Sequence, residues 1–211
     1  MSFPTLKVTY FDVPGRAEMM RLALTIGDVP FEDERLTREA WTAFKPSAPF
    51  KQIPLLTVDG QVLAQSSAIT RYAGILAGLY PTDNHLDACR VDEIVAFGED
   101  VFMTILPTLF EQDADKKKAM REELAATKLP EMLAMLEARL AGASKGPWFL
   151  STISLADLAV YTMVGMFKSG WLDNIPLDIC DKYSKIMSIC EAVSTHPKVA
   201  AWNEAHKKTD P

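Results

Sequence analysis

The chain has 211 residues, of which 48% are hydrophobic and 24% charged, and its formal net charge is −6. This composition supports packed cores and excludes a disordered chain, while the acidic balance argues against a general nucleic-acid binder, which needs a basic face. Residues 1–80 hold eight basic and eight acidic residues, so the negative charge belongs to residues 81–211. A small anionic ligand is therefore expected on the first part of the chain.

The compartment is predicted from cysteine use and from the first residues. Three cysteines, Cys89, Cys180 and Cys190, form no metal-binding spacing, and an odd, sparse set is typical of a reducing compartment. The opening residues lack the basic and apolar regions of a signal peptide, and no run of about 18 apolar residues is free of charges. We expect a cytoplasmic protein that does not bind membranes.

Residues 1–80 carry the patterns of a mixed α/β domain. Alternating polarity predicts a strand over residues 5–10, and apolar residues at helical spacing predict a helix over 16–26 that Gly27 closes. A polar strand near a sheet edge is expected over 31–36 and a short helix over 38–45. Prolines at positions 46, 49 and 54 then indicate a loop.

The same domain is predicted to end with a hairpin and a helix. Asp59-Gly60 lies between two apolar runs, which indicates a tight hairpin over residues 54–64. Ser66 is expected to cap a helix over residues 68–79. The resulting order is βαβαββα, which implies a small sheet covered by helices.

The rest of the chain lacks strand signals and is predicted to be an all-α helical bundle. Residues 81–85 form the expected linker, which divides a domain of residues 1–80 from one of residues 86–211. The helices are expected near residues 85–112, 116–141, 154–170, 178–193 and 196–207. Ser154 and Asp157 have the spacing of a capping box, and Pro197 suits the first turn of a helix.

Three places in the first domain have residues that suit a ligand. A phenol at Tyr10, with Arg16 nearby, could donate a hydrogen bond to a thiolate and lower the thiol pKa; a tyrosine at the core edge is the commoner meaning of this pattern. Gln65 and Ser66 begin a helix, where a carboxylate could bind, although Ser66 could serve only as a cap. Pro54 could follow a cis bond, although trans is the usual state.

Five segments together carry a resemblance to a known family. They are Leu6–Glu18, Pro49–Gly60, Gln65–Tyr72, Val91-Asp92 with Glu99-Asp100, and Ser154–Asp157. In this order and at this spacing they resemble the cytosolic glutathione transferases of the tyrosine type, and most of all the sigma class. The resemblance covers nearly the whole chain.

The resemblance implies a thioredoxin-like N-terminal domain, an all-helical C-terminal domain and a glutathione site. It makes Tyr10 the residue that stabilises the thiolate of glutathione, the co-substrate, with Arg16 as electrostatic support. The other glutathione contacts that it implies are Trp41, Lys45, Gln52, Ile53, a cis Pro54, Gln65, Ser66 and, reaching across from the neighbouring subunit, Asp100.

It also implies a homodimer with Phe50 at the interface, and a folding cap at Ser154 and Asp157. An electrophile site is expected between the domains, lined by Phe11, Val13, Pro14, Met103, Pro107 and Trp202. Two positions depart from the sigma pattern. Gln52 replaces the usual lysine, and Ala96 replaces an acidic residue associated with metal effects in some prostaglandin isomerases, so no metal is expected.

The function expected from this resemblance is conjugation of glutathione to hydrophobic electrophiles. Isomerisation or peroxide reduction by the same thiolate, as in a prostaglandin D synthase, is a second enzymatic hypothesis. A non-catalytic protein that binds glutathione or hydrophobic ligands is the third. Such a protein need not keep Tyr10, Arg16, Gln65 and Ser66 together, and this argues for an enzyme.

Overall fold

A computed structural model describes residues 2–142 and 146–207, and the chain divides into two compact units. The first unit comprises Met1–Ala88 with Pro197–Pro211, and the second comprises Cys89–His196. The predicted linker at residues 81–85 stays a prediction, and the outer ends of both predicted domains, residues 1 and 208–211, lie outside the described residues.

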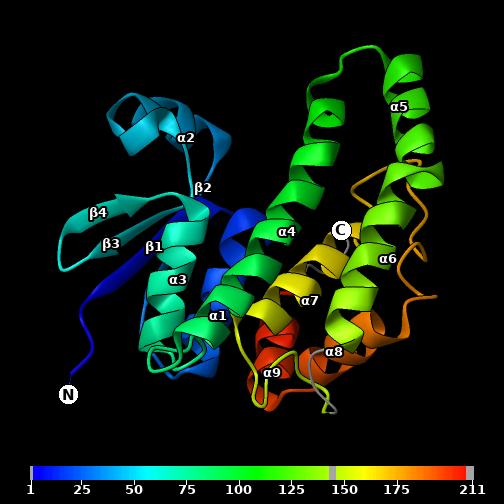
Figure 1. Cartoon of the computed structure of the whole chain (residues 1–211). Helices are drawn as coiled ribbons and strands as arrows, with labels where there is room; N and C mark the ends of the chain where they lie inside the picture. Colours follow the sequence, from blue (N-terminus) through cyan, green and yellow to red (C-terminus); the bar gives the residue numbers. More distant parts are fainter. Residues whose placement is uncertain (1, 143–145, 208–211) are drawn as a thin grey trace. The chain divides into compact units, whose positions relative to one another are not determined.

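The first unit contains a four-stranded sheet in the order β2-β1-β3-β4 (Figure 1). Its strands are β1 (Leu6–Phe11), β2 (Glu32–Leu36), β3 (Leu55–Val58) and β4 (Gln61–Ala64). β1 runs parallel to β2 and antiparallel to β3, which pairs antiparallel with β4. The polar strand β2 lies at the edge, as predicted, and the predicted hairpin is confirmed, with Asp59 and Gly60 both in the left-handed region at φ 47° and 84°.

The α-helices that lie wholly within the described part of the first unit are α1 (Glu18–Ile26), α2 (Arg38–Phe44), α3 (Ser66–Leu76) and α9 (Pro197–Ala205). A 3-10 turn at Gly15–Ala17 leads into α1. The helix ends at Ile26, before Gly27 as predicted, but the φ of Gly27 is −78°. Glycine is needed there because a Cβ would lie 2.5 Å from the Cα of Ala77, so the close approach of two backbones selects it.

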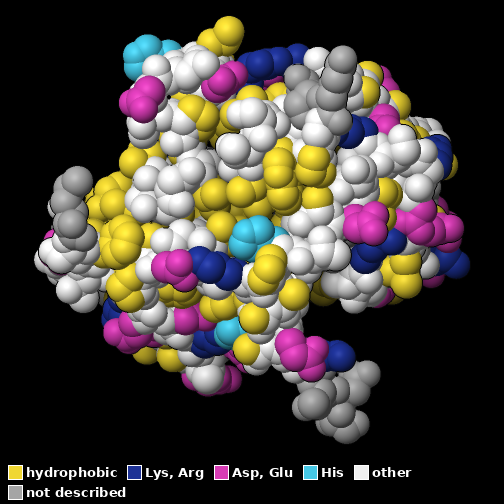
Figure 2. Space-filling view, turned by 90° about the horizontal axis from the view of Figure 1, so that it is seen from below, with side chains coloured by type: hydrophobic (Ala, Val, Ile, Leu, Met, Phe, Trp, Pro, Cys, Tyr) yellow, Lys and Arg dark blue, Asp and Glu magenta, His cyan; other side chains and the backbone are white. Residues whose placement is uncertain are grey.

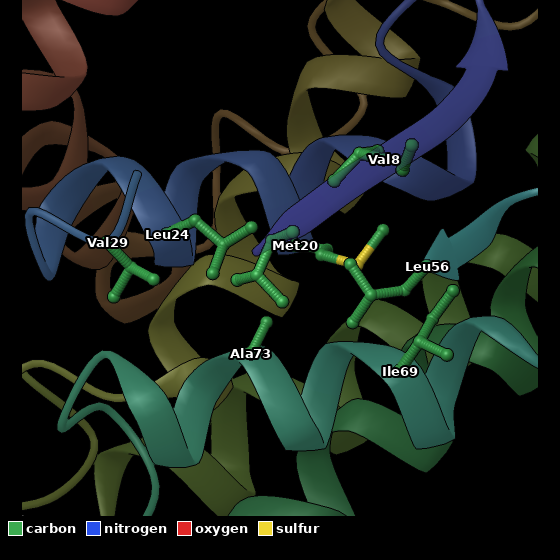
Figure 3. Packing of buried hydrophobic residues seen from close by; sticks show 9 residues of the cluster. Val8, Met20, Leu24, Val29, Leu56, Ile69 and Ala73 are labelled. Carbon is green, nitrogen blue, oxygen red and sulfur yellow. The ribbon is translucent and has the colours of Figure 1, made fainter. Parts of the chain in front are cut away.

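The core of the first unit lies between the sheet and helices α1 and α3. Figure 3 shows Ile69 and Ala73 of α3 directed towards Met20 and Leu24 of α1, with Val8 of β1 and Leu56 of β3 beside them. These side chains are almost fully buried. Apart from the methyl group of Ala73, each of these side chains contributes about 1.5–3 kcal/mol on burial, so this cluster holds the sheet against both helices.

Helix α9 packs with the first unit although it follows the second unit in the sequence. Lys198 Nζ donates to the carbonyl of Ile26 at 2.8 Å and forms an ion pair with Asp28. Trp202 Nε1 donates to Glu18 Oε1 at 2.7 Å. Pro197 is the first residue of α9, as predicted. Proline suits this position because a backbone N–H there would have no partner within the helix.

The second unit is helical, and the prediction of one helix over residues 116–141 is wrong. Its helices are α4 (His85–Phe110, whose first four residues belong to the first unit), α5 (Ala114–Ala126), α6 (Lys128–Ala141), α7 (Leu155–Lys168) and α8 (Ser184–Ser194). The break falls at Thr127, with φ −125° and ψ −80°. Pro130 explains it, since its ring would clash with the carbonyl of Ala126 in a continuous helix.

Two carboxylates hold helix starts in the second unit. Asp157 accepts hydrogen bonds from the amide and hydroxyl of Ser154 at 2.8 and 2.9 Å, in the predicted capping box, and from the amide of Phe149 at 2.7 Å. Burial raises the pKa of Asp157, against the lowering effect of these hydrogen bonds. Glu137 of α6 accepts from the amides of Lys185 and Ile186 at 2.8 and 2.9 Å. It thereby caps α8, which begins at residue 184 and not at 178.

Charged side chains of opposite sign lie close to one another on the face seen in Figure 2. The ion pairs of the second unit include Arg139 with Glu93 and Lys168 with Asp181, each at 2.6 Å. Among the described residues, no helix combines the length and apolar character needed to cross a membrane.

Candidate active site

The strand register brings most of the predicted glutathione residues to one end of the sheet. Thr9 pairs with Leu55, and Leu55 pairs with Ala64. Tyr10, Pro54 and Gln65, one residue further along their segments, therefore lie at the same edge. β2 also ends there, since Phe11 pairs with Leu36, and α2 follows directly.

Tyr10 is half-buried, and its hydroxyl oxygen meets the start of the first 3-10 turn. The amide of Arg16 donates to Tyr10 Oη at 3.4 Å. A phenol has one donor hydrogen and two acceptor sites. With the amide of Arg16 on the acceptor side, the phenol hydrogen remains able to point to a ligand.

The guanidinium of Arg16 joins Tyr10 to the start of α3. Arg16 Nη2 donates to Ser66 Oγ at 3.0 Å, across 50 residues of sequence. The prediction that Ser66 caps its helix is wrong: Ser66 is the first residue of α3, and Gln65 precedes it as the N-cap with φ 74° and makes no side-chain capping bond. α3 also ends at Leu76, three residues before the predicted end. Exposed Gln65 and half-buried Ser66 thus stand at a positive helix end beside a cation, an arrangement that suits a carboxylate.

Arg21 supports the loop between β1 and α1 and was missed by the sequence analysis. Its side chain is fully buried, and Nε donates to Asp33 Oδ1 at 2.9 Å. Its two terminal nitrogens donate to the carbonyls of Val13 at 2.8 Å and Phe11 at 3.3 Å. The guanidinium carbon lies 5.8 Å from the centre of the Tyr10 ring. An arginine between buried Ala17 and Leu24 at helical spacing was the available signal.

The remaining predicted glutathione residues lie on α2 and in the loop before β3. Trp41 of α2 packs edge-on against Phe11, with ring centres 6.4 Å apart, while Lys45 follows α2 and is exposed. The Ile53–Pro54 bond is cis, which confirms that prediction. Gln52 is exposed and extended.

Other predicted site residues are separated between the two units. Asp100, Met103 and Pro107 share one exposed face of α4 in the second unit. Trp202 belongs to the first unit, where it stacks on His206 at 3.8 Å. Phe50 is 72% exposed with φ 54°, which is the geometry of a side chain that the described chain does not cover.

The first unit contains a cavity of about 260 Å³. Val13 and Pro14 are among its lining residues, and their assignment to an electrophile wall stays a prediction. The other lining residues carry charge or titrate, and they are Asp12, Glu18, Arg35 and His206. Arg35 is paired with Asp12 at 2.6 Å and with Asp33 at 2.8 Å. These flanking ion pairs hold the pKa of Arg35 above its ordinary value, against the lowering effect of burial. Within residues 2–142 and 146–207, no group of three or more His, Cys, Asp or Glu side chains could hold a metal ion.

Comparison with known proteins assigns both parts of the chain to one family. Residues 6–74 match the model of the glutathione S-transferase N-terminal domain, and residues 99–206 match the model of the C-terminal domain. The chain belongs to the glutathione S-transferase family. The matched ranges include Tyr10 and the whole sheet, and they confirm the thioredoxin-like domain followed by a helical one.

Relatives of this transferase include proteins named glutathione S-transferase, prostaglandin D synthase and S-crystallin. Glutathione S-transferase 1 of Ascaris suum is 36% identical over 98% of each chain. Hematopoietic prostaglandin D synthase of Gallus gallus is 34% identical, again over 98% of each chain. The solved structure of prostaglandin synthase D of Nilaparvata lugens has a TM-score of 0.86 at 32% identity, with 99% of this chain and 100% of that chain covered. The chain is a glutathione S-transferase by this evidence.

Proposed function

We propose that this transferase joins the glutathione thiolate to hydrophobic electrophiles and that Tyr10 stabilises the thiolate. The observation that carries the proposal is the Tyr10 hydroxyl, whose oxygen accepts the Arg16 amide and whose hydrogen remains available to sulfur. Donation from a neutral hydroxyl favours the charged thiolate over the neutral thiol, which lowers the thiol pKa.

The size of the required effect is within reach of this group. A free thiol has a pKa near 8.5, so only a few per cent is ionised at pH 7. Lowering the pKa by about two units makes the thiolate dominant and needs about 2.7 kcal/mol of differential stabilisation. A hydrogen bond to a charged group contributes about 1.5–3 kcal/mol. Tyr10 with the nearby charge of Arg16 can supply this.

The other end of glutathione has complementary groups in the first unit. Glutathione carries two carboxylates and one amine. We assign the γ-glutamyl carboxylate to Gln65 and Ser66, where the start of α3 and Arg16 are both positive. Trp41 and Lys45 would meet the glycine end, while Gln52 and the backbone of Ile53 before cis Pro54 would hold the cysteinyl part.

The proposal extends to the assembly. The exposed Asp100 on α4 would bind the glutamyl amine in the neighbouring subunit of a homodimer, and exposed Phe50 would lie in the interface. We expect this dimer to function in the cytoplasm. Phe11, Val13, Pro14, Met103, Pro107 and Trp202 remain our proposal for the electrophile wall.

Isomerisation is the second candidate activity, because relatives named prostaglandin D synthase match the chain as fully as relatives named transferase do. It would use the same thiolate, as would peroxide reduction. A non-catalytic binding protein would lack the shifted thiol pKa. The three functions therefore separate on two measurements, the thiol pKa and the product formed.

The deciding experiment titrates the ultraviolet absorbance of the bound thiolate against pH for the wild type and Tyr10→Phe. We expect a bound thiol pKa near 6.5 in the wild type and a value close to 8.5 in the variant. At pH 7 the ionised fraction of the bound thiol would then fall from about three quarters to about 3%, so conjugation of a chloronitrobenzene should fall about 25-fold. An unshifted thiol pKa in the wild type, with glutathione bound, would mean a binding protein.

A further inference from the structure

The loop between β1 and α1 brings a glycine directly against the phenol of Tyr10. Gly15 opens the 3-10 turn that precedes α1, five residues after Tyr10 in the sequence. A Cβ on Gly15 would lie 2.8 Å from both Tyr10 Oη and the ring carbon Cε1, and 3.2 Å from Cζ. Real Cβ atoms do not come this close to other heavy atoms. The hydroxyl end of Tyr10 therefore occupies the space that a side chain at position 15 would fill.

The backbone of Gly15 adds a second constraint. Its φ is +46°, in the left-handed region that residues with a side chain seldom adopt. The two constraints have different consequences. Strain from φ acts on the stability of the loop, whereas the close approach acts on Tyr10, because the atoms in the way are the far end of that one side chain.

The position of the hydroxyl is sensitive to such a push. Its contact with the Arg16 amide is already 3.4 Å long, near the limit for a hydrogen bond. The ring of Tyr10 also has a fixed neighbour, since the fully buried Arg21 lies 5.8 Å from the ring centre and is held by Asp33. A methyl group at position 15 thus displaces Oη from the amide and from the place where it meets sulfur.

We propose that Gly15 is a positioning residue for catalysis: by having no side chain, it fixes the Tyr10 hydroxyl where it can donate to the glutathione thiolate. This inference rests on the proposed function of Tyr10. It assigns to Gly15 no contact with glutathione or with the electrophile, so its effect must pass through Tyr10.

The test compares Gly15→Ala with two control variants in the same unit, Gly60→Ala and Gly78→Ala. Both control glycines have positive φ, at +84° and +70°, and a Cβ on either would meet nothing within 4 Å. The control variants therefore carry the backbone strain of a positive φ without a steric contact on Tyr10. The readouts are the pKa of the bound glutathione thiol, kcat and KM for glutathione, and the melting temperature.

For Gly15→Ala we expect a fall in kcat of about tenfold or more, since small misplacements of a reacting group are costly, with KM for glutathione changed less than twofold. The bound thiol pKa should move towards that of Tyr10→Phe, and the same change in a Tyr10→Phe background should alter kcat little. Gly60→Ala and Gly78→Ala should keep the wild-type thiol pKa and kcat. A wild-type thiol pKa in Gly15→Ala, or an equal loss of kcat with and without the Tyr10 hydroxyl, would overturn the proposal.

A second comparison covers the case in which Gly15→Ala folds poorly. Removing the phenol in Tyr10→Ala takes away the atoms that the new methyl meets. If the push exists, adding Gly15→Ala should lower the melting temperature less in Tyr10→Ala than in the wild type; equal losses would overturn the inference. A wild type whose bound thiol has an ordinary pKa would instead refute the role of Tyr10, and with it the proposed function, whatever the stability cycle gives.

Discussion

Replacing Arg21 by lysine isolates the contribution of a buried guanidinium to the loop that presents Tyr10. The Arg21 fork reaches Asp33 at 2.9 Å, the carbonyl of Val13 at 2.8 Å and that of Phe11 at 3.3 Å. A lysine keeps the charge, but its single compact ammonium cannot meet all three acceptors at once. Asp33 retains Arg35 as a partner, which limits the loss.

The expected cost follows from the acceptors left without a donor. Two partly buried carbonyl acceptors at about 1–3 kcal/mol each give a loss of about 2–6 kcal/mol in the free energy of unfolding. Since the two carbonyls belong to the last residue of β1 and to the loop that follows it, directly after Tyr10, kcat/KM should also fall, by about tenfold. Urea unfolding followed by circular dichroism measures the first quantity and a conjugation assay measures the second.

Arg139→Lys is the matched control, because Arg139 also binds with two nitrogens, to Glu93 at 2.9 and 2.6 Å. Those side chains are 43% and 47% exposed, so water screens the pair and replaces lost bonds. We expect a cost of at most about 1 kcal/mol and unchanged kcat/KM. Equal unfolding free energies for the two lysine variants would refute the reasoning from burial.

Two further predictions concern titrating groups. The hydroxyl of Thr9 holds the pKa of Glu34 below its ordinary value, against the raising effect of burial and with further help from Lys7. The stability that Glu34 adds is therefore present above the unfolded pKa and is lost as pH falls through the folded pKa. Glu34→Gln should cost about 0.5–1 kcal/mol at pH 7 and nothing near pH 2, by urea unfolding. Burial raises the pKa of the Cys180 and Cys190 thiols to about 12, whereas Cys89 is exposed. A disulfide reagent at pH 8 should therefore react rapidly with one thiol per chain, and Cys89→Ser should abolish this rapid phase. A rapid phase that persists in Cys89→Ser would contradict the assignment.

Much of the fold follows from local signals that act within a few residues. Asp59-Gly60 requires left-handed backbone at two positions and so forms the hairpin, and Ser154 with Asp157 defines the start of α7. Tyr10 could be placed at a strand end from alternation alone. The catalytic role of Tyr10 could be inferred only from the resemblance of five segments to a known family, because a tyrosine at a strand end is more often a packing residue.

The signals that failed depend on groups far apart in the sequence or on single backbone angles. The sequence predicts a helix cap at Ser66, but its hydroxyl instead accepts a hydrogen bond from Arg16, 50 residues earlier. Gln65 adopts φ 74°, which no residue pattern around it indicates. The partners of Arg21 come from two segments, so its role appears only when α1, β2 and the first loop have met.

The cap that Glu137 provides for α8 bears on when this helix can form during synthesis of the chain. α8 has no side-chain cap of its own, and the carboxylate that receives its first amides lies 48 residues or more earlier, on α6. During synthesis from the N-terminus, Glu137 therefore leaves the ribosome before Lys185 and Ile186. The capping carboxylate is therefore already present when the first residues of α8 emerge. A peptide of α8 alone would lack the residue that caps its first turn.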